Sequence, residues 1–205
     1  MPKKIHHANR WRSINPILPL TWYEKSATDV APRLLGCVLV RKSRAGVVVG
    51  RIVETEAYLG PHDPASHAYH GPTPRNAVMF GPAGRAYIYF TYGLHHCLNV
   101  VTGSRHNGQA VLIRALEPLV GLALMKKRRG LSDLHQLTNG PAKLTEALNI
   151  TRADNGRRLS SGLLSIHRGW RLRGERIQRS RRVGISQGRS QLYRFYLKGN
   201  PCLSR

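Results

Sequence analysis

Short runs of β-branched and apolar residues recur along the chain, and they predict strands. Two such runs, residues 37–41 and 47–53, flank a turn that contains glycine. The second run continues through residues 54–58, which places two carboxylates inside a strand. Further strands are predicted in the same way at residues 86–90, 97–101, 110–115, 163–167, 182–185 and 192–197.

Apolar residues recur at helical spacing in three other segments. Residues 27–35 form a short helical pattern that Ser26 or Thr28 is suited to cap. Residues 117–129 and 141–150 form the other two. The mixture of short helices and more numerous strands predicts an α+β fold.

No internal repeat and no linker divides the 205 residues. We therefore expect a single mixed domain with a curved, mostly antiparallel sheet, short helices and a protruding β-hairpin. The hairpin is expected within residues 86–101, and residues 1–18 are expected to form a basic N-terminal arm.

The charge of the chain indicates that the protein binds an anionic partner. There are 33 Lys and Arg against 10 Asp and Glu, and the net charge is +23. Such a charge indicates nucleic acid as the first candidate partner and an anionic membrane surface as the second. Membrane binding would require a long basic helix with a clean apolar face, and the sequence shows none. Basic clusters that either contact phosphates or form a solvated surface include Lys126, Lys127, Arg128, Arg129, Arg181 and Arg182.

The chain carries no stretch that approaches the ~18 apolar residues of a membrane helix. Its basic N-terminus is not followed by the apolar region of a signal peptide. We therefore expect an intracellular protein, located in the cytoplasm or nucleoid of a bacterium or in the nucleus of a eukaryote.

The three cysteines, Cys37, Cys97 and Cys202, are widely spaced and are expected to be buried free thiols, with a disulfide or zinc site as the alternative. Several histidines lie between residues 62 and 96, but none has metal-ligand spacing. There is no phosphate-binding loop and no nucleophile elbow. The sequence therefore predicts no metal and no cofactor.

The two carboxylates in the strand are the first candidates for chemistry. Alternation along a strand places Glu54, Glu56 and Tyr58 on one face, with the carboxylates about 7 Å apart. Either each carboxylate pairs with an arginine such as Arg51 or Arg114, or one of them acts as an acid or base. Their spacing alone leaves both interpretations open.

Tyrosines and histidines crowd the segment from residue 58 to residue 92. Such rings hold single-stranded or flipped bases by stacking, or they pack within half-buried strands. The residues concerned are Tyr58, His62, His67, Tyr69, His70, Tyr87, Tyr89 and Tyr92.

Five motifs in a fixed order carry a family resemblance. They are Val-Glu-Thr-Glu-Ala-Tyr-Leu-Gly-Pro (53–61), Thr-Pro-Arg-Asn (73–76), Val-Leu-Ile-Arg-Ala-Leu-Glu-Pro (111–118), Asn-Gly-Pro-Ala-Lys-Leu (139–144) and Arg-Phe-Tyr-Leu-Lys-Gly-Asn-Pro (194–201). Together they closely resemble the alkyladenine type of 3-methyladenine DNA glycosylase. The match extends over residues 19–203, so residues 19–205 are expected to form a DNA glycosylase domain.

The resemblance implies an enzyme of base-excision repair that acts as a monomer on double-stranded DNA with damaged purines. Members flip the base out of the helix and hydrolyse the N-glycosidic bond of 3-methyladenine, 7-methylguanine or hypoxanthine, without a cofactor. By position, Glu56 resembles the general base that activates water. Arg114 resembles its partner, and the backbone carbonyl of Val183 resembles a third contact to the water.

The resemblance also implies a base-binding pocket. Tyr58, His67 and Tyr89 resemble the walls that stack on the flipped base, and Asn99 resembles the residue that excludes the 2-amino group of guanine. Tyr92 resembles the wedge that enters the DNA helix. Glu54 is then structural. The pocket-forming segments contain no lysine, so strand cleavage by lyase activity is not expected. The alternative is a basic nucleic-acid-binding protein without catalysis.

Overall fold

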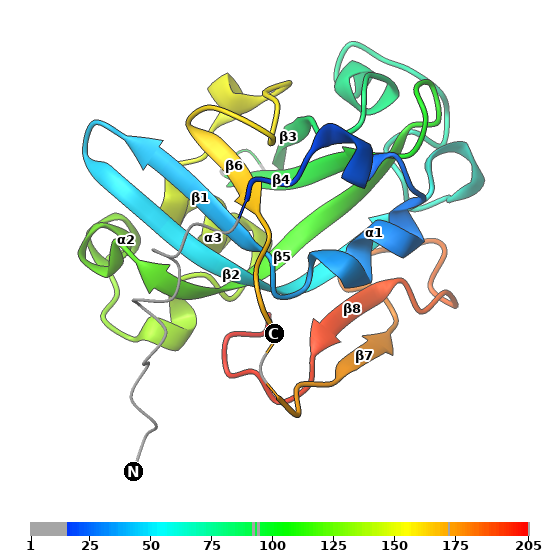
Figure 1. Cartoon of the computed structure of the whole chain (residues 1–205). Coiled ribbons are helices and arrows are strands. Elements are labelled where there is room, and N and C mark those ends of the chain that lie inside the picture. Colours follow the sequence, from blue (N-terminus) through cyan, green and yellow to red (C-terminus); the bar gives the residue numbers. More distant parts are fainter. Residues whose placement is uncertain (1–15, 92, 94, 172, 205) are drawn as a thin grey trace.

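A computed structural model describes residues 16–91, 93, 95–171 and 173–204 of the chain, and Figure 1 shows its arrangement. One curled sheet of eight strands dominates it, in the order β3-β4-β5-β2-β1-β6, with β8 also paired to β2 and β7 to β8. Every strand pair is antiparallel. The strands are β1 (Val38–Ser43), β2 (Gly46–Tyr58), β3 (Ala86–Thr91), β4 (His95–Thr102), β5 (Gln109–Val120), β6 (Leu164–His167), β7 (Ile177–Ser180) and β8 (Arg194–Leu197).

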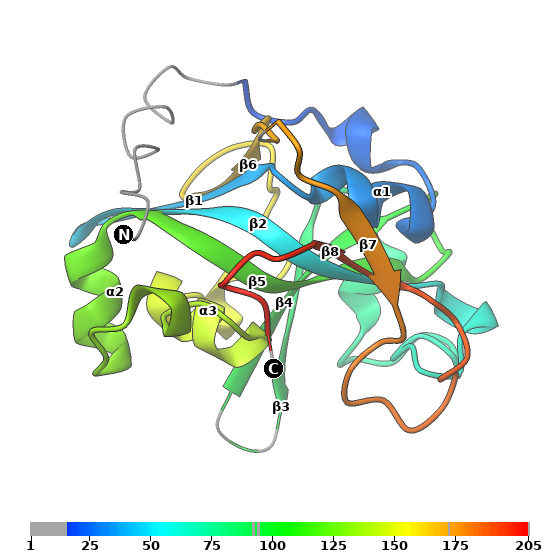
Figure 2. The ribbon, with the colours of Figure 1, turned by 90° about the horizontal axis from the view of Figure 1, so that it is seen from below.

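Short helices cover both faces of this sheet, which confirms the predicted α+β class. Figure 2 shows α1 on one side of β2 and β5 and the other two α-helices on the opposite side. The α-helices are α1 (Ala27–Leu34), α2 (Leu122–Arg129) and α3 (Pro141–Leu148). Single 3-10 turns are η2 (Leu20–Tyr23), η3 (Gly60–His62), η4 (Ala77–Phe80), η5 (Leu134–Gln136) and η6 (Arg152–Asp154).

Helix α1 forms for the reasons that its sequence indicates. The Ser26 side chain accepts a hydrogen bond from the Asp29 N–H at 3.3 Å and caps the first turn. The buried residues recur at helical spacing and enter the main hydrophobic core; they are Ala27, Val30, Ala31 and Leu34. The packing of α1 on β2 fixes which face of that strand is left for other contacts.

The helix predicted at residues 117–129 is wrong over residues 117–121. Residues up to Val120 continue β5, where Glu117 pairs with Arg51 of β2. Gly121 then takes a left-handed conformation (φ 76°), and a Cβ there would lie 2.6 Å from the Val47 carbonyl oxygen. The chain therefore turns sharply at Gly121, and the helix begins only at Leu122.

The Arg-rich C-terminal third also differs from its prediction. Residues 182–185 form a loop instead of a strand, and β7 lies before them at Ile177–Ser180. Among the described strands, β7 pairs with β8 alone, at the edge of the sheet. Its sequence, Ile-Gln-Arg-Ser, lacks the apolar alternation of a half-buried strand, so the backbone pairing with β8 decides its conformation.

The packed domain begins slightly before residue 19. Ile17 forms an isolated bridge with His167, and the Leu18 N–H donates to the Ile166 carbonyl at 2.9 Å. Leu18 is buried in the main core. Residues 1–15 of the predicted arm lie outside the described residues.

The strands of the expected hairpin are β3 and β4, which pair from Ala86 with Val100 to Thr91 with His95. Tyr92, the predicted wedge, lies outside the described residues.

Candidate active site

The face of β2 that carries the two carboxylates is the one predicted from alternation. The Thr55 hydroxyl donates to the Ala31 carbonyl of α1 at 2.9 Å, so Thr55 faces the helix. Glu54 and Glu56 face the other way, and both contact Arg114 of β5. Register shifts on either side of Glu54 show that β2 is irregular here, yet the carboxylates stay on one face.

Glu54 is enclosed and fully satisfied by hydrogen bonds. Its Oε1 accepts from Arg114 Nε at 3.0 Å, Arg194 Nε at 2.7 Å and the Ser204 hydroxyl at 2.7 Å. Its Oε2 accepts from the Ser204 N–H at 2.7 Å. A carboxylate with 0% exposure and donors on both oxygens anchors its neighbours, and Glu54 is not among the residues that line the cleft described below.

Glu56 is equally buried but has fewer partners. Oε1 accepts from the Val183 N–H at 2.8 Å and lies 3.3 Å from Arg114 Nη1. Among the residues that the structure describes, Oε2 accepts a hydrogen bond only from the Tyr58 hydroxyl, at 2.8 Å. Because a carboxylate oxygen can accept two hydrogen bonds, Oε2 has capacity for one further donor.

Burial and charge act in opposite directions on Arg114. Burial lowers the pKa of Arg114, but attraction to Glu56 and Glu54 outweighs it, and the pKa ends above its usual value. Burial, followed by the neighbouring charge of Glu56, raises the pKa of Tyr58 well above 10. Tyr58 therefore stays a neutral hydroxyl that donates to Glu56, while Arg114 stays a cation.

A cleft of about 520 Å³ opens above these groups. Tyr58, Arg114 and Val183 form part of its wall, and the Glu56 carboxylate lies directly behind them. The cleft brings together every described residue of the predicted base pocket, since His67, Tyr89 and Asn99 also line it. Lining residues that the sequence reasoning did not assign to the pocket include Met79, Tyr87, Cys97, Leu112, Pro141 and residues 184–187.

The aromatic side of the cleft is a set of neutral rings in edge contact. His67 Nδ1 lies 2.9 Å from the Tyr87 hydroxyl, and the rings of His67 and Tyr89 meet edge to face with centroids 4.5 Å apart. Burial, helped by the charge of Arg75, lowers the pKa of His67, and burial raises the pKa of Tyr87 to about 12. The Tyr87 hydroxyl thus keeps its proton, and His67 is held neutral.

Asn99 of β4 is one of the residues that line the cleft. Its side-chain N–H donates to the Tyr87 carbonyl at 3.2 Å, and it is only 4% exposed. This bond to the strand backbone fixes the amide at one orientation, with its remaining groups beside the cleft.

The basic clusters predicted from sequence are not equivalent. Arg182 is buried and paired with Asp63, so the expectation that it contacts the DNA backbone does not fit its position. Arg128 donates to the Ala147 carbonyl at 2.9 Å and Arg129 pairs with Glu146, so both tie α2 to α3. Lys127 and Arg181 are exposed, and Lys126 is half-buried.

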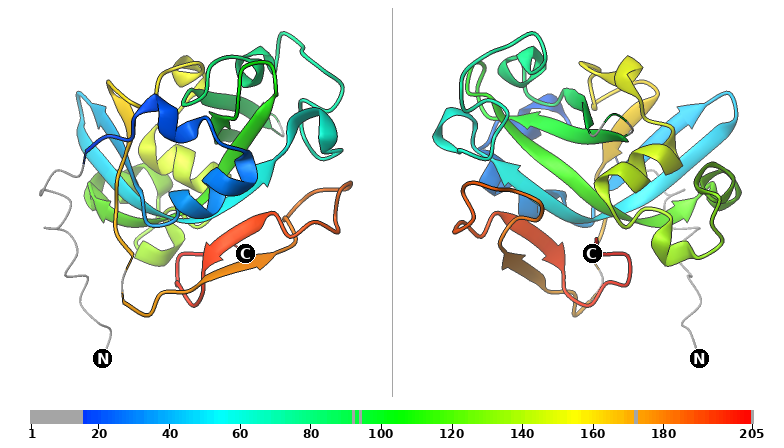
Figure 3. Two further views of the ribbon diagram at one scale, coloured as in Figure 1. Left: turned by 45° about the vertical axis from the view of Figure 1, so that its right-hand side comes forward. Right: turned by 180° about the vertical axis from the view of Figure 1, so that it is seen from behind.

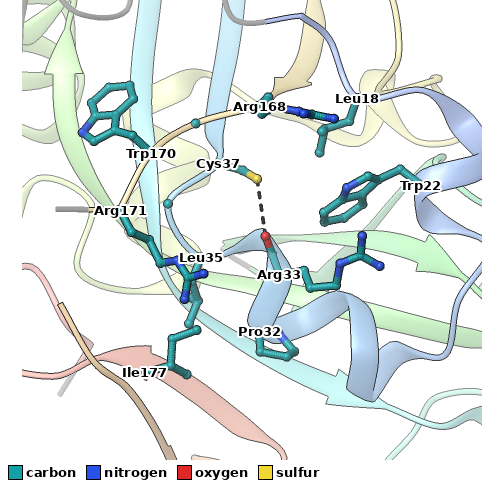
Figure 4. A pocket seen from close by; sticks show the side chains of 12 residues that line it. Leu18, Trp22, Pro32, Arg33, Leu35, Cys37, Arg168, Trp170, Arg171 and Ile177 are labelled. Carbon is teal, nitrogen blue, oxygen red and sulfur yellow. Dashed lines mark hydrogen bonds between the residues drawn. The ribbon is translucent and has the colours of Figure 1, made fainter. Parts of the chain in front are cut away.

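A second cavity of about 410 Å³ lies on the α1 side of the sheet, between α1, the start of β1 and residues 168–171 (Figure 4). It holds Trp22, three arginines and Cys37, and none of the described residues that line it is acidic. The Cys37 thiol donates to the Arg33 carbonyl at 3.5 Å, and burial raises its pKa to about 11. This cavity therefore supplies neither a base nor a thiolate nucleophile.

The three cysteines are buried and free, as predicted. Within the described ranges, no group of three or more His, Cys, Asp or Glu is arranged to hold a metal ion. In the same part of the chain, no helix is both long and apolar enough to span a membrane.

Comparison with known proteins decides the family. The model of the family described as methylpurine-DNA glycosylase (MPG) matches residues 21–201. The chain belongs to the methylpurine-DNA glycosylase family. A protein of Methanoculleus marisnigri named "Putative 3-methyladenine DNA glycosylase" is 51% identical over 92% of this chain and 98% of its own length. A Carboxydothermus hydrogenoformans protein of the same name is 48% identical over 92% of this chain and 99% of its own length.

Membership in the methylpurine-DNA glycosylase family confirms the resemblance seen in the motifs. The chain is a DNA glycosylase, which is a hydrolase of DNA repair, and its substrate is DNA. The alternative of a basic binding protein without catalysis is thereby disfavoured.

Proposed function

We propose that this glycosylase hydrolyses the N-glycosidic bond of alkylated or deaminated purines that have been flipped out of duplex DNA. The substrates would be 3-methyladenine, 7-methylguanine and hypoxanthine, and the products a free base and an abasic site. The observation that carries the proposal is the Glu56 carboxylate, held by Arg114, Val183 and Tyr58 directly behind an aromatic cleft.

In this proposal Glu56 is the general base. Oε2 has capacity for one more hydrogen bond and can accept it from a water molecule that enters beside Tyr58. As the water oxygen bonds to C1′, its proton passes to Glu56 and the electron pair of the C1′–N bond stays with the purine. Arg114 holds the carboxylate from the other side. The Val183 N–H contacts Glu56, and the proposed contact between its carbonyl and the water stays a prediction.

The chemistry needs one base and no acid when the purine is already cationic, as 3-methyladenine is. The developing positive charge on the sugar is also stabilised by a nearby carboxylate. Hypoxanthine is neutral and leaves more slowly without a proton donor. Glu54 is fully occupied by arginines and Ser204, so it is not an acid for this step.

The cleft suits a flipped purine. Tyr58, His67 and Tyr89 present neutral rings, and a cationic base binds electron-rich faces more strongly than a neutral one. The fixed amide of Asn99 would crowd the 2-amino group of guanine and reduce attack on normal DNA. Tyr92 would fill the gap that the flipped base leaves in the helix.

The expected lack of lyase activity has a simple basis. Strand cleavage through a Schiff base needs an amine at the sugar, and no lysine is among the described residues that line the cleft. We also propose that the protein acts as a monomer on duplex DNA.

The proposed substrates can be tested with duplexes that each carry one modified purine. Separate duplexes with 3-methyladenine, 7-methylguanine, hypoxanthine and 1,N6-ethenoadenine are incubated with the enzyme, and the free base is measured. Release of 3-methyladenine that persists in EDTA, with an intact strand before alkali treatment, is expected. No release from any duplex, despite tight binding, would overturn the proposal.

A further inference from the structure

The loop between β7 and β8 supplies one wall of the cleft without regular structure of its own. Residues 183–187 of this loop line the cleft, and the Val183 N–H reaches Glu56 at 2.8 Å. Figure 3 shows the loop extending from β7 and β8 toward the segment that follows β2. Residues 64–67 of that segment form another part of the wall.

Arg182 joins these two walls. Its Nη1 donates to the Ala57 carbonyl at 2.9 Å, and its Nη2 donates to the Gly188 carbonyl at 3.3 Å and to Asp63 Oδ1 at 2.8 Å. Nη1 also binds Asp63 Oδ2, which makes the ion pair bidentate. The guanidinium carbon lies 4.7 Å from the Tyr58 ring centroid. One side chain therefore connects the end of β2, the loop and the Asp63 segment.

Asp63 is the other half of this connection. It is 3% exposed, and it also accepts from the Leu59 N–H at 3.2 Å and the Ala65 N–H at 3.1 Å. These bonds shape the turn that leads to His67. Burial lowers the pKa of Arg182, but the hydrogen bond and attraction to Asp63 outweigh it, so Arg182 stays a cation.

We propose that the Asp63–Arg182 ion pair is a positioning latch, which holds the Val183 N–H on Glu56 and the Tyr58 ring at the edge of the cleft. This inference rests on the proposed role of Glu56. A buried ion pair often adds little net stability compared with apolar residues, so its value here lies in geometry. Only a planar guanidinium reaches Asp63 with two parallel bonds while it also binds the Ala57 and Gly188 carbonyls.

The test separates positioning from general stability with a matched pair elsewhere. Asp154 is 1% exposed and pairs with Arg41 at 2.7 Å, and neither residue lines the cleft. Asp63→Asn, Arg182→Lys and the control Asp154→Asn are compared with the wild type. Melting temperature, duplex affinity and the single-turnover excision rate of 3-methyladenine at saturating enzyme are measured for each.

Asp63→Asn and Arg182→Lys are expected to slow excision by about 100-fold, the loss typical of a misplacement near 1 Å at a reacting centre. Duplex affinity is expected to change far less, and Asp154→Asn is expected to excise like the wild type despite a similar loss of melting temperature. Arg182→Lys keeps the charge of the pair and decides the question if Asp63→Asn does not fold.

Wild-type excision by Arg182→Lys, or a loss in Asp154→Asn as large as in Asp63→Asn, would overturn the latch. Failure of the proposed function has a different signature, which is wild-type protein that releases no base or Glu56→Gln protein that releases it at the normal rate.

Discussion

Replacing Glu54 with Gln should destabilise the protein strongly, because this carboxylate is the centre of a buried charge cluster. It accepts two hydrogen bonds from arginines, at 3.0 Å from Arg114 and 2.7 Å from Arg194, and two from Ser204. A glutamine keeps the shape but removes the negative charge. Among the described residues, Arg114 then retains only Glu56, at 3.3 Å, as an ionic partner, and Arg194 loses its only ion-pair partner.

The size of the effect follows from the burial of the cluster. Breaking a buried ion pair by removing one partner costs about 3–5 kcal/mol. In a domain of this size, each kcal/mol lowers the melting temperature by about 2–4 °C, so Glu54→Gln should melt about 6–20 °C below the wild type. Differential scanning calorimetry at neutral pH measures this shift.

Glu56→Gln is the matched comparison for Glu54→Gln. It leaves Arg114 paired with Glu54, and the amide oxygen of glutamine can still accept a hydrogen bond. A much smaller shift in melting temperature is therefore expected. If Glu54→Gln melted within about 2 °C of the wild type, or if both variants fell equally, the unequal roles of the two carboxylates would be refuted.

Two further predictions concern protonation and salt. The pKa of His67 is lowered in the folded protein, so the unfolded chain binds more protons below about pH 6.5 and the free energy of unfolding should fall as the pH falls. Urea titrations at about pH 7.5 and about pH 5.5 should show a smaller loss of this free energy in His67→Gln than in the wild type. An equal loss in the two proteins would contradict the assignment. Arg181→Ala should reduce the salt slope of duplex binding by about 0.9, the value for one phosphate contact. Arg128→Ala should leave the salt slope unchanged, because the Arg128 guanidinium binds the Ala147 carbonyl. A reduced slope for Arg128→Ala together with an unchanged slope for Arg181→Ala would reverse the assignment.

Most of the strands and helices that were predicted correctly followed from the alternation of residues along strands and from local helix caps. The strand through Glu54 and Glu56 and the shared face of the carboxylates follow from the period of two residues. The end of β5 was missed because residues 117–120 fit a helical pattern equally well, and only pairing with β2 and the left-handed Gly121 decide between them.

Long-range contacts explain what the sequence did not reveal at the site. Glu54 and Glu56 differ because Arg194 and Ser204 bind Glu54. Both residues lie far from Glu54 in the sequence, and nothing in the residues around them predicts this contact. The same holds for Arg182, whose place in a run of arginines suggested a surface role, although Asp63 binds it in the interior. By contrast, His67, Tyr89 and Asn99 were assigned to the pocket from the family resemblance, and the structure places them in one cleft.

The single-turnover rate of Glu56→Gln tests the central claim most directly. Saturating enzyme is mixed with a duplex that contains one 3-methyladenine, and release of the base is followed beside binding of the same duplex. The account predicts that excision is abolished while the variant stays folded and still binds the duplex. Excision at a near-wild-type rate would show that Glu56 is not the base.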